Sequence, residues 1–293
     1  MEIVRIGIHE LEAVADWLAA QNTELSKQVG YVGTDADDIF IQLSQDMLDG
    51  EETSMVAAKE QGQLVALIGL DITEDSAEVW GPFSSVDDTA LQEALFVELK
   101  RLYPHIEEFG FYLHVDNKTQ QQFVESLGAT KEGTHLLLAA QKDGFEKTAA
   151  IDVVPYEEAY EQQVIALHDA AFPETYYDGQ TIVRRASRME HCYLLLVVKE
   201  QTVVAYSYFE VDSYTNEASL NYIFVADSER GSGVGNALLQ EVIHAIFLHD
   251  GIDEILLSVN RENEQAFKLF TKAGFHIRSE HMYYHLLLET AEV

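Results

Sequence analysis

The chain has 293 residues, of which 47% are hydrophobic and 24% are charged. This length exceeds the common domain size of about 100–150 residues, so we expect two domains, and the composition excludes a disordered chain and a fibrous one. Lysine and arginine number 18 against 51 aspartates and glutamates, which gives a net charge of −33 and a surface that repels nucleic-acid backbones.

The acidic surface has two interpretations. It serves solubility, or it attracts cations such as amines, polyamines and basic peptides. Residues 1–20 show no basic start followed by an apolar run, and no apolar run reaches the roughly 18 residues that a membrane span needs. We therefore expect a cytoplasmic protein with no membrane partner. Cys192 is the only cysteine, which excludes a disulfide within the chain, and no metal site is predicted.

In the first half, a strand is predicted at 77–83 and a second at 134–138. A short polar stretch with a glycine follows at 141–147, between two apolar runs. We place a linker at about 142–150 and expect domains at 1–145 and 150–293.

In the second half, helices and strands are mixed. Helices are expected at 157–172, within 176–189, at 233–249 and at 262–273, and strands at 192–198, 203–210, 218–225, 255–259 and 282–288. The order predicts an α+β fold whose central sheet is partly antiparallel.

The two halves repeat a pattern. Eleven residues separate Asn117 from Gly128, and eleven separate Asn263 from Gly274. In each half the interval has a helical pattern, the glycine is placed to end the helix, and a strand follows. The shared order indicates a duplicated fold.

A glycine-rich turn follows the strand at 218–225. It reads Arg230-Gly231-Ser232-Gly233-Val234-Gly235 and leads directly into a helix. Glycines allow backbone N–H groups to approach an anion, and the helix start adds unpaired donors. No lysine follows Gly235, so the ATP-type phosphate loop is excluded, and the dinucleotide fingerprint is a poor match because position 238 is leucine.

This turn resembles the pyrophosphate motif of the GCN5-related N-acetyltransferase (GNAT) family, Arg/Gln-x-x-Gly-x-Gly/Ala. The segment 259–275 is similar to a second motif of that family, Asn-x-x-Ala-x-x-Leu-Tyr-x-x-x-Gly-Phe. Residues 150–293 carry the resemblance strongly, and the first half follows the same fold in outline. The resemblance implies a tandem of two GNAT-like domains, each with a mixed, mostly antiparallel sheet flanked by helices, and acetyl-CoA as the cosubstrate.

The resemblance also implies the residues that contact the cofactor. The pantetheine arm would pair with the strand end at Ile223, Phe224 and Val225, and the pyrophosphate would lie on the turn from Arg230 through Gly231, Ser232, Gly233 and Val234 to Gly235. Asn263 and Phe270 occupy the cofactor-contacting positions of the second motif. The family often has a tyrosine where Phe270 stands, so a proton for the departing thiolate would have to come from elsewhere.

Acetyl transfer to an amine also requires removal of a proton. Glu210 and Glu217, near strand ends, are the candidate bases, and Tyr283 is the candidate acid, with Tyr222 and Tyr284 as alternatives. Each has an ordinary structural interpretation beside this one, as a surface carboxylate or a packed ring.

The first half lacks the anion-binding turn. Its strand at 77–83 is followed by Asp87 and Asp88, which would repel a pyrophosphate, so we predict that this domain binds no CoA. It would instead shape the acceptor pocket, act as a scaffold or form a homodimer. The loop at 172–178, rich in acidic and aromatic residues, is where the family builds its acceptor site and would suit a cationic amine.

We therefore expect an enzyme, an acyltransferase that moves an acetyl group from acetyl-CoA to a primary amine by direct attack in a ternary complex. Two alternatives stay open: a CoA-binding sensor with weak or no turnover, and a related acyl or aminoacyl transferase.

Overall fold

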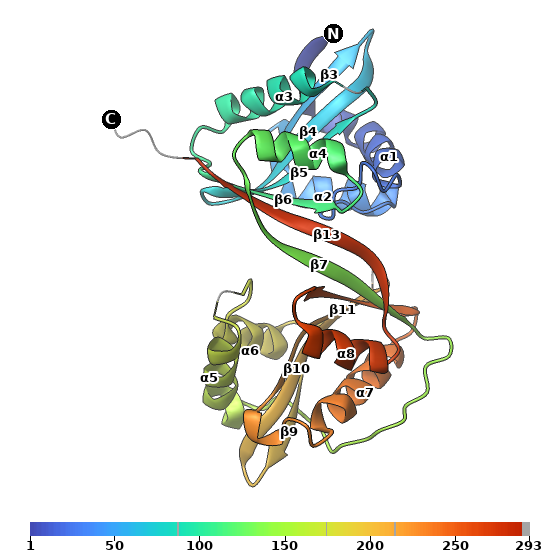
Figure 1. Cartoon of the computed structure of the whole chain (residues 1–293), viewed down its shortest axis with the longest axis vertical. Helices are drawn as coiled ribbons and strands as arrows, with labels where there is room; N and C mark the ends of the chain where they lie inside the picture. The colour runs from blue at the N-terminus through green and yellow to red at the C-terminus, as the bar shows by residue number, and fades with distance from the viewer. Residues whose placement is uncertain (87, 174, 214, 289–293) are drawn as a thin grey trace. The chain divides into compact units, whose positions relative to one another are not determined.

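A computed structural model describes residues 1–86, 88–173, 175–213 and 215–288 (Figure 1). The chain divides into two compact units: unit 1 is formed by residues 1–135 and the segment from Ser279 onward, and unit 2 by residues 136–278. Among the described residues, no helix is both long and apolar enough to cross a membrane.

Unit 1 is a mixed sheet with helices. Its strands follow the order β1 (Glu2–Gly7), β3 (Glu52–Glu60), β4 (Gln63–Thr73), β5 (Ser76–Ser84), β6 (Glu108–His114) and β13 (His276–Leu287), and β2 (Leu48–Asp49) pairs with β3. Its helices are η1 (Ile8–Glu10), α1 (Leu11–Asn22), α2 (Ala36–Asp46), α3 (Thr89–Leu102) and α4 (Lys118–Ser126). The pair β5–β6 is parallel, and the other pairs of β1 to β6 are antiparallel.

Unit 2 repeats this plan. Its strands follow the order β8 (Val154–Pro155), β9 (Cys192–Lys199), β10 (Thr202–Asp212), β11 (Glu217–Val225), β12 (Glu254–Asn260) and β7 (Thr130–Gln141). Its helices are η2 (Glu158–Tyr160), α5 (Glu161–Ala171), α6 (Gly179–Arg188), η3 (Asp227–Glu229), α7 (Val234–Phe247) and α8 (Glu264–Lys272). The pair β11–β12 is parallel, as β5–β6 is in unit 1. The prediction of an α+β fold with two mixed, mostly antiparallel sheets is confirmed.

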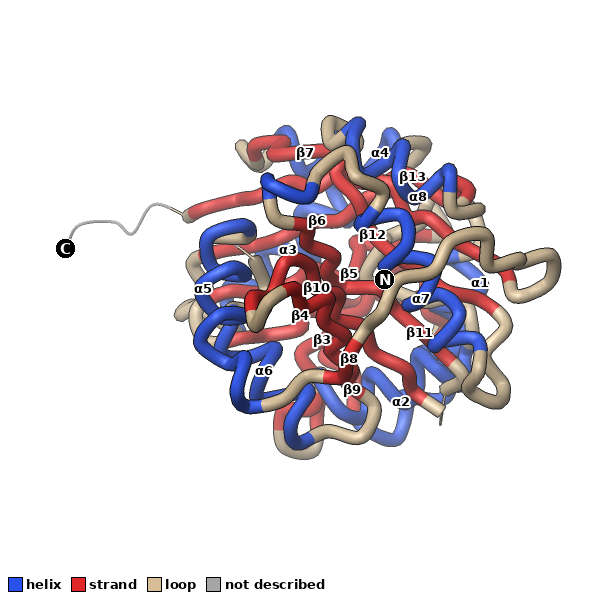
Figure 2. The backbone as a smooth tube through the Cα atoms, turned by 90° about the horizontal axis from the view of Figure 1, so that it is seen from below, coloured by secondary structure: helices blue, strands red, loops and turns tan. Residues whose placement is uncertain are grey.

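The sheet of unit 2 has a hydrophobic core on each face. Helices α5 and α6, side by side in Figures 1 and 2, pack with Tyr206 and Tyr208 of β10. Helices α7 and α8 pack with Ala205 and Val211 of the same strand. Because side chains alternate across a strand, one strand supplies both cores.

Two long strands exchange between the units. Residues 281–287 of β13 pair with residues 108–114 of β6, and Tyr284 and Leu286 lie in the core of unit 1. In return, Leu136 and Leu138 of β7 lie in the core of unit 2. Each sheet is thus completed by a strand from the other half of the sequence. The units therefore do not coincide with the predicted segments 1–145 and 150–293.

The segment predicted as a linker packs against unit 2. Lys147 Nζ lies 2.5 Å from a Glu241 carboxylate oxygen on α7, and the Phe145 and Phe247 ring centroids are 5.7 Å apart. Residues 142–150 therefore belong to unit 2, because Phe145 and Lys147 pack against helix α7.

Candidate active site

The strands β11 and β12 diverge in unit 2. Within the described residues their pairing is confined to Ser219 and Leu256, while β11 stays paired with β10 as far as Val225. The predicted residues Ile223, Phe224 and Val225 are half-buried on this open stretch. A strand edge without a neighbour can pair with an extended molecule through its backbone N–H and C=O groups.

The glycine-rich turn lies at the end of β11. Gly231 and Gly233 have φ angles of +76° and +91°, a region that favours glycine, and no heavy atom lies within 4 Å of a Cβ built at either position. The backbone of this turn is therefore open to a ligand without a side chain in the way.

Helix α7 starts at this turn. Its N-cap is Gly233, and no side chain caps it. A Cβ built at Gly235 would lie 3.3 Å from Val225 Cγ2, so a glycine here lets the helix start approach β11 closely. The first backbone N–H groups of α7 and the positive end of its dipole thus form an anion-binding site next to the open strand edge.

Charged side chains around the turn are paired with one another. Arg230 Nη1 lies 2.9 Å from Asp227 Oδ1, and the Arg230 side chain is 54% exposed. Lys199 Nζ lies 2.8 Å from Glu229 Oε2. Since each cation has a carboxylate partner, the backbone amides and the helix dipole supply the attraction for an anion here.

The second predicted motif is divided between the surface and the core. Asn263 is exposed and is the N-cap of α8, where its Oδ1 accepts a hydrogen bond from Ala266 N at 3.0 Å. Phe270 is 6% exposed and packs edge-on against Phe275 at 5.8 Å between centroids. The Phe270 ring thus belongs to the core beneath α8.

A hydrogen-bond network ties the 172–178 loop to the sheet. The Tyr222 hydroxyl on β11 lies 2.6 Å from Thr175 Oγ1 and accepts a bond from Tyr177 N at 3.2 Å. His168 Nε2 lies 2.7 Å from the Tyr177 carbonyl, so this nitrogen is the donor, and Nδ1 then accepts from the Tyr206 hydroxyl at 2.7 Å. Glu174 of this loop lies outside the described residues.

Burial disfavours the charged form of the histidine in that network. Its side chain has no exposure, and burial lowers the pKa of His168. Sequence reasoning missed both His168 and Tyr206. The available signal was the alternation of Tyr206 and Tyr208 in a predicted strand, but their partner His168 lies 38 residues away along the chain.

The first candidate base, Glu210, is already paired. Both of its carboxylate oxygens lie 3.0 Å from Arg185 Nη2, and the Tyr208 hydroxyl also donates to it. The guanidinium of Arg185 stacks over Tyr177, 4.7 Å from the ring centroid. One guanidinium nitrogen of Arg185 and the Tyr208 hydroxyl occupy this carboxylate, so Glu210 is placed to hold Arg185 against the loop.

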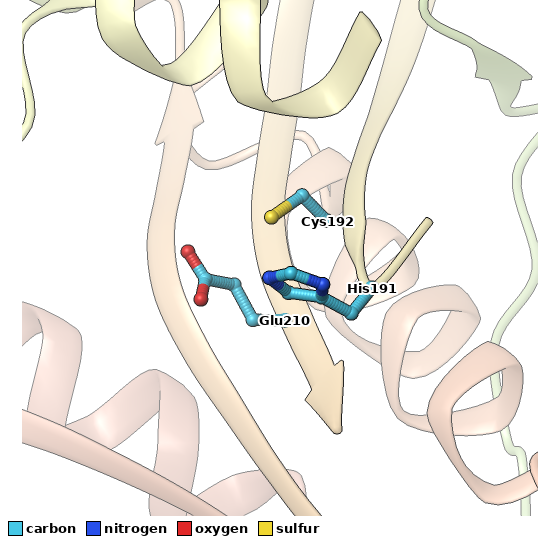
Figure 3. A group of neighbouring side chains, drawn as sticks. All are labelled: His191, Cys192 and Glu210. Carbon is cyan, nitrogen blue, oxygen red and sulfur yellow. The ribbon is translucent and has the colours of Figure 1, made fainter. Parts of the chain in front are cut away.

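The same carboxylate belongs to a cluster with His191 and Cys192 (Figure 3). One potential ligand atom of each lies within 4.8 Å of the others, a spacing that a metal ion could bridge. Burial raises the pKa of the Cys192 thiol, and Arg185 occupies the carboxylate. A protonated thiol and an ion-paired carboxylate are poor ligands, so we assign no metal here.

Of the other two candidates, one lies at the far end of β11 and the other belongs to unit 1. Glu217 is at the start of β11, opposite Asp212, and six residues before Ile223, which is about 20 Å along a strand. Tyr283 belongs to unit 1, where it pairs with Tyr112 of β6, and burial raises its pKa. The alternative acid Tyr284 is also in unit 1, and its hydroxyl donates to Glu125.

Comparison with known proteins agrees with this arrangement. The model of the acetyltransferase (GNAT) family matches residues 157–275, a range that contains the turn, the diverging strands and α8. Comparison with curated proteins gives no match.

Solved structures resemble the chain over its whole length. A GCN5-related N-acetyltransferase from Sphaerobacter thermophilus is 16% identical, covers 99% of this chain with 97% of its own, and gives a TM-score of 0.77. A tandem GNAT protein from the clavulanic acid biosynthesis pathway is 13% identical, with 99% of each chain covered and a TM-score of 0.68. A GNAT-family acetyltransferase from Colwellia psychrerythraea is 13% identical, covers 98% of this chain with 100% of its own, and gives 0.60.

At sequence identities of 13% to 16%, the solved structures establish the fold of the chain and nothing finer. The family match applies to residues 157–275. The chain has the fold of tandem GNAT proteins, and its residues 157–275 match the acetyltransferase (GNAT) family.

Proposed function

We propose that unit 2 binds acetyl-CoA and transfers its acetyl group to a primary amine by direct attack in a ternary complex. One observation carries the proposal: an uncapped helix start with two left-handed glycines adjoins a strand edge that has lost its neighbour. The turn suits a pyrophosphate, and the edge suits an extended arm with amide groups, so the pair fits the diphosphate and the pantetheine arm of a CoA molecule.

The acceptor amine would enter beside the 172–178 loop. Tyr222 on β11 holds this loop through Thr175 and Tyr177, so its hydrogen bonds fix one wall next to the stretch assigned to the thioester. The net charge of −33 raises the local concentration of cations, which favours amines that are protonated in solution.

The reaction must release one proton and one thiolate. The amine attacks only in its neutral form, and an ordinary thiol has a pKa of about 8.5, so a CoA thiolate leaves readily without an obligatory acid. Phe270 has no proton to give and lies in the core, which is consistent with a leaving group that departs unassisted.

Calorimetric titration of the full chain with acetyl-CoA tests the cofactor assignment. We expect one molecule per chain, because among the described residues the uncapped glycine turn lies in unit 2, whereas the start of α3 is capped by Asp88. No binding would overturn the proposal, and two molecules per chain would overturn the prediction that unit 1 binds no CoA.

Turnover is tested by thiol release from acetyl-CoA with a panel of primary amines, including polyamines and basic peptides. Release that depends on one class of amine supports the transferase. Tight binding of acetyl-CoA with no release for any amine would favour the sensor.

A further inference from the structure

We propose that unit 1 fills its own ligand slot with residues 28–30, which act as a permanent internal substitute for an extended ligand. Within the described residues, β5 and β6 pair in parallel over 76–78 and 108–110 and then separate, as β11 and β12 do in unit 2. The opening between β5 and β6 is called the slot of unit 1. Its comparison with a cofactor site rests on the function proposed for unit 2.

The edge of β6 beyond this separation is paired with residues 28–30. Gly30 N donates to the Tyr112 carbonyl at 2.6 Å. His114 N donates to the Gln28 carbonyl at 3.1 Å. The two bonds enclose an antiparallel bridge, so a short piece of chain takes over as the neighbour of β6 where β5 has moved away.

The other edge of β6 is occupied by β13. Val115 N donates to the Glu280 carbonyl at 2.9 Å, just after the strand. Leu288 N donates to the Glu107 carbonyl at 2.8 Å, just before it. Backbone groups of successive residues point to opposite edges of a strand, so the even-numbered residues that bond 28–30 face the slot.

Two buried asparagines hold the segment in place. Asn22 Oδ1 accepts from Val29 N at 2.7 Å, and its Nδ2 donates to the Gly33 carbonyl at 3.0 Å. Asn117 Nδ2 donates to the Gln28 carbonyl at 3.2 Å. Asn22 and Asn117 are 0% and 1% exposed. The segment is therefore a fixed part of unit 1, because its backbone is bonded by side chains of α1 and of the α4 start as well as by β6.

The β5 edge of the slot offers little to an extended arm. Pro82 has no backbone N–H, and its carbonyl accepts from Gln120 Nε2 at 2.6 Å. Pro82 lies across a small pocket from Ser26 and Lys27, directly before the segment. At the end of β11 in unit 2, residues 223–225 contain no proline. Both edges of the slot in unit 1 are thus satisfied by the chain itself.

A filled slot is a barrier to CoA that does not depend on the acidic cap of α3. Asp88→Gly uncaps α3 but leaves residues 28–30 in place. Calorimetric titration of this variant with acetyl-CoA should therefore give no more molecules per chain than the unchanged protein. An additional molecule bound by Asp88→Gly would overturn the proposal.

Amide hydrogen exchange of the full chain without ligand tests the occupied edge directly. The His114 amide should exchange slowly, and Gly30→Pro should speed it at least about tenfold, because the segment loses a donor and gains bulk. A Cβ built at Gly30 would lie 2.3 Å from Tyr112 Cδ1. The Val115 amide, bonded to β13, is the internal control and should stay slow. A fast His114 amide in the unchanged protein would overturn the proposal.

A milder variant decides the case if Gly30→Pro also frees Val115. Asn117→Asp keeps the oxygen that caps α4 and removes the donor to the Gln28 carbonyl, so His114 exchange should rise several-fold. Asn263→Asp, the equivalent change in unit 2, should not alter it. Unchanged His114 exchange in Asn117→Asp would overturn the proposal. Failure of the function proposed for unit 2 has a separate readout, since acetyl-CoA would then not slow exchange at 223–225.

Discussion

Helices α3 and α7 start at equivalent places in the two units. The backbone N–H groups at the two starts nevertheless have different partners. In unit 1 the Asp88 carboxylate caps α3 and accepts from Leu91 N at 3.2 Å. In unit 2 the N-cap is Gly233, and no side chain caps the helix. The Asp88 carboxylate occupies one free N–H donor of α3 and repels an anion, whereas the uncapped start of α7 keeps its donors for an external partner. Asp87, the other acidic residue predicted at this place, lies outside the described residues.

The two asparagines of the repeat share a backbone conformation but differ in their surroundings. Asn117 and Asn263 have almost identical backbone angles, with φ and ψ of −79° and 67° in one and −80° and 69° in the other, and both cap a helix. Asn117 is 1% exposed and its Nδ2 donates to the Gln28 carbonyl, whereas Asn263 is exposed. The sequence repeat therefore reflects a shared backbone, while the neighbours decide whether the amide is free for a ligand.

Removal of the exchanged strand β13 should have the largest effect, because it should unfold one unit and leave the other folded. Truncation after Arg278 removes the strand that carries Tyr284 and Leu286, so unit 1 should lose its cooperative fold while unit 2 keeps its core. Limited proteolysis should then digest residues 1–135 and spare 136–278. Truncation after Leu288 is the control and should leave both units resistant. A protected unit 1 without residues 279–293 would contradict the exchange.

A carboxylate placed at the uncapped helix start breaks the comparison directly. Gly235→Asp puts a negative charge in the first turn of α7 and should weaken acetyl-CoA binding about 100-fold or more, since like charges a few ångströms apart repel by several kcal/mol. Ala90→Asp places the same residue at the equivalent position of α3 and should leave binding unchanged. Calorimetry measures both. Equal losses in the two variants would remove the assignment of the site to unit 2.

Acid should destabilise unit 1 through a buried histidine. His281, 3% exposed and near His114 and His135, has its pKa lowered to about 4 by burial and by those two rings. The unfolded chain, with a pKa near 6.5, binds more protons than the folded one between these values, so stability is complete above about pH 6.5 and falls towards pH 4. The loss amounts to about 3 kcal/mol.

Chemical unfolding at several pH values, followed by protease resistance of residues 1–135, measures this dependence. His281→Gln should flatten it, and His105→Gln, at an exposed position of the same unit, should not. An unchanged slope in His281→Gln would assign the acid sensitivity to other groups.

The smallest expected effects come from substitutions of Asn263. They distinguish its role as the cap of α8 from its proposed contact with acetyl-CoA. Asn263→Ala removes the cap of α8 and should cost about 1 kcal/mol in stability. Asn263→Asp keeps the accepting oxygen and removes the N–H donor, so stability should hold while acetyl-CoA affinity falls several-fold. Thermal unfolding and calorimetry distinguish these outcomes. Unchanged affinity in Asn263→Asp would leave the residue with capping alone.

Local patterns predicted much of this molecule. The turn at 230–235, the helix that follows it and the two helices that end before Gly128 and Gly274 are properties of short segments, and the structure places them as expected. The strand exchange was not predictable, because the strands before residues 141 and 288 have similar apolar patterns and either could complete either sheet.

Long-range partners explain why the surroundings of two candidate residues could not be predicted. Glu210 looked like a free carboxylate because nothing nearby in the sequence marks Arg185, 25 residues earlier, as its partner. Tyr283 looked like a residue of the second domain because chain order suggests it, while pairing with β6 places it in unit 1. In both cases packing at a distance decides the neighbour.

The position of β13 in the sequence has a consequence for synthesis. The partner of β6 is residues 281–287, so the first sheet cannot close until these residues have emerged from the ribosome. Until then β6 presents an unpaired edge, the kind of surface that recruits other nascent chains. The core of unit 2 is formed by residues between 136 and 278, and all of these are synthesised before residues 281–287. The half made first is therefore finished last.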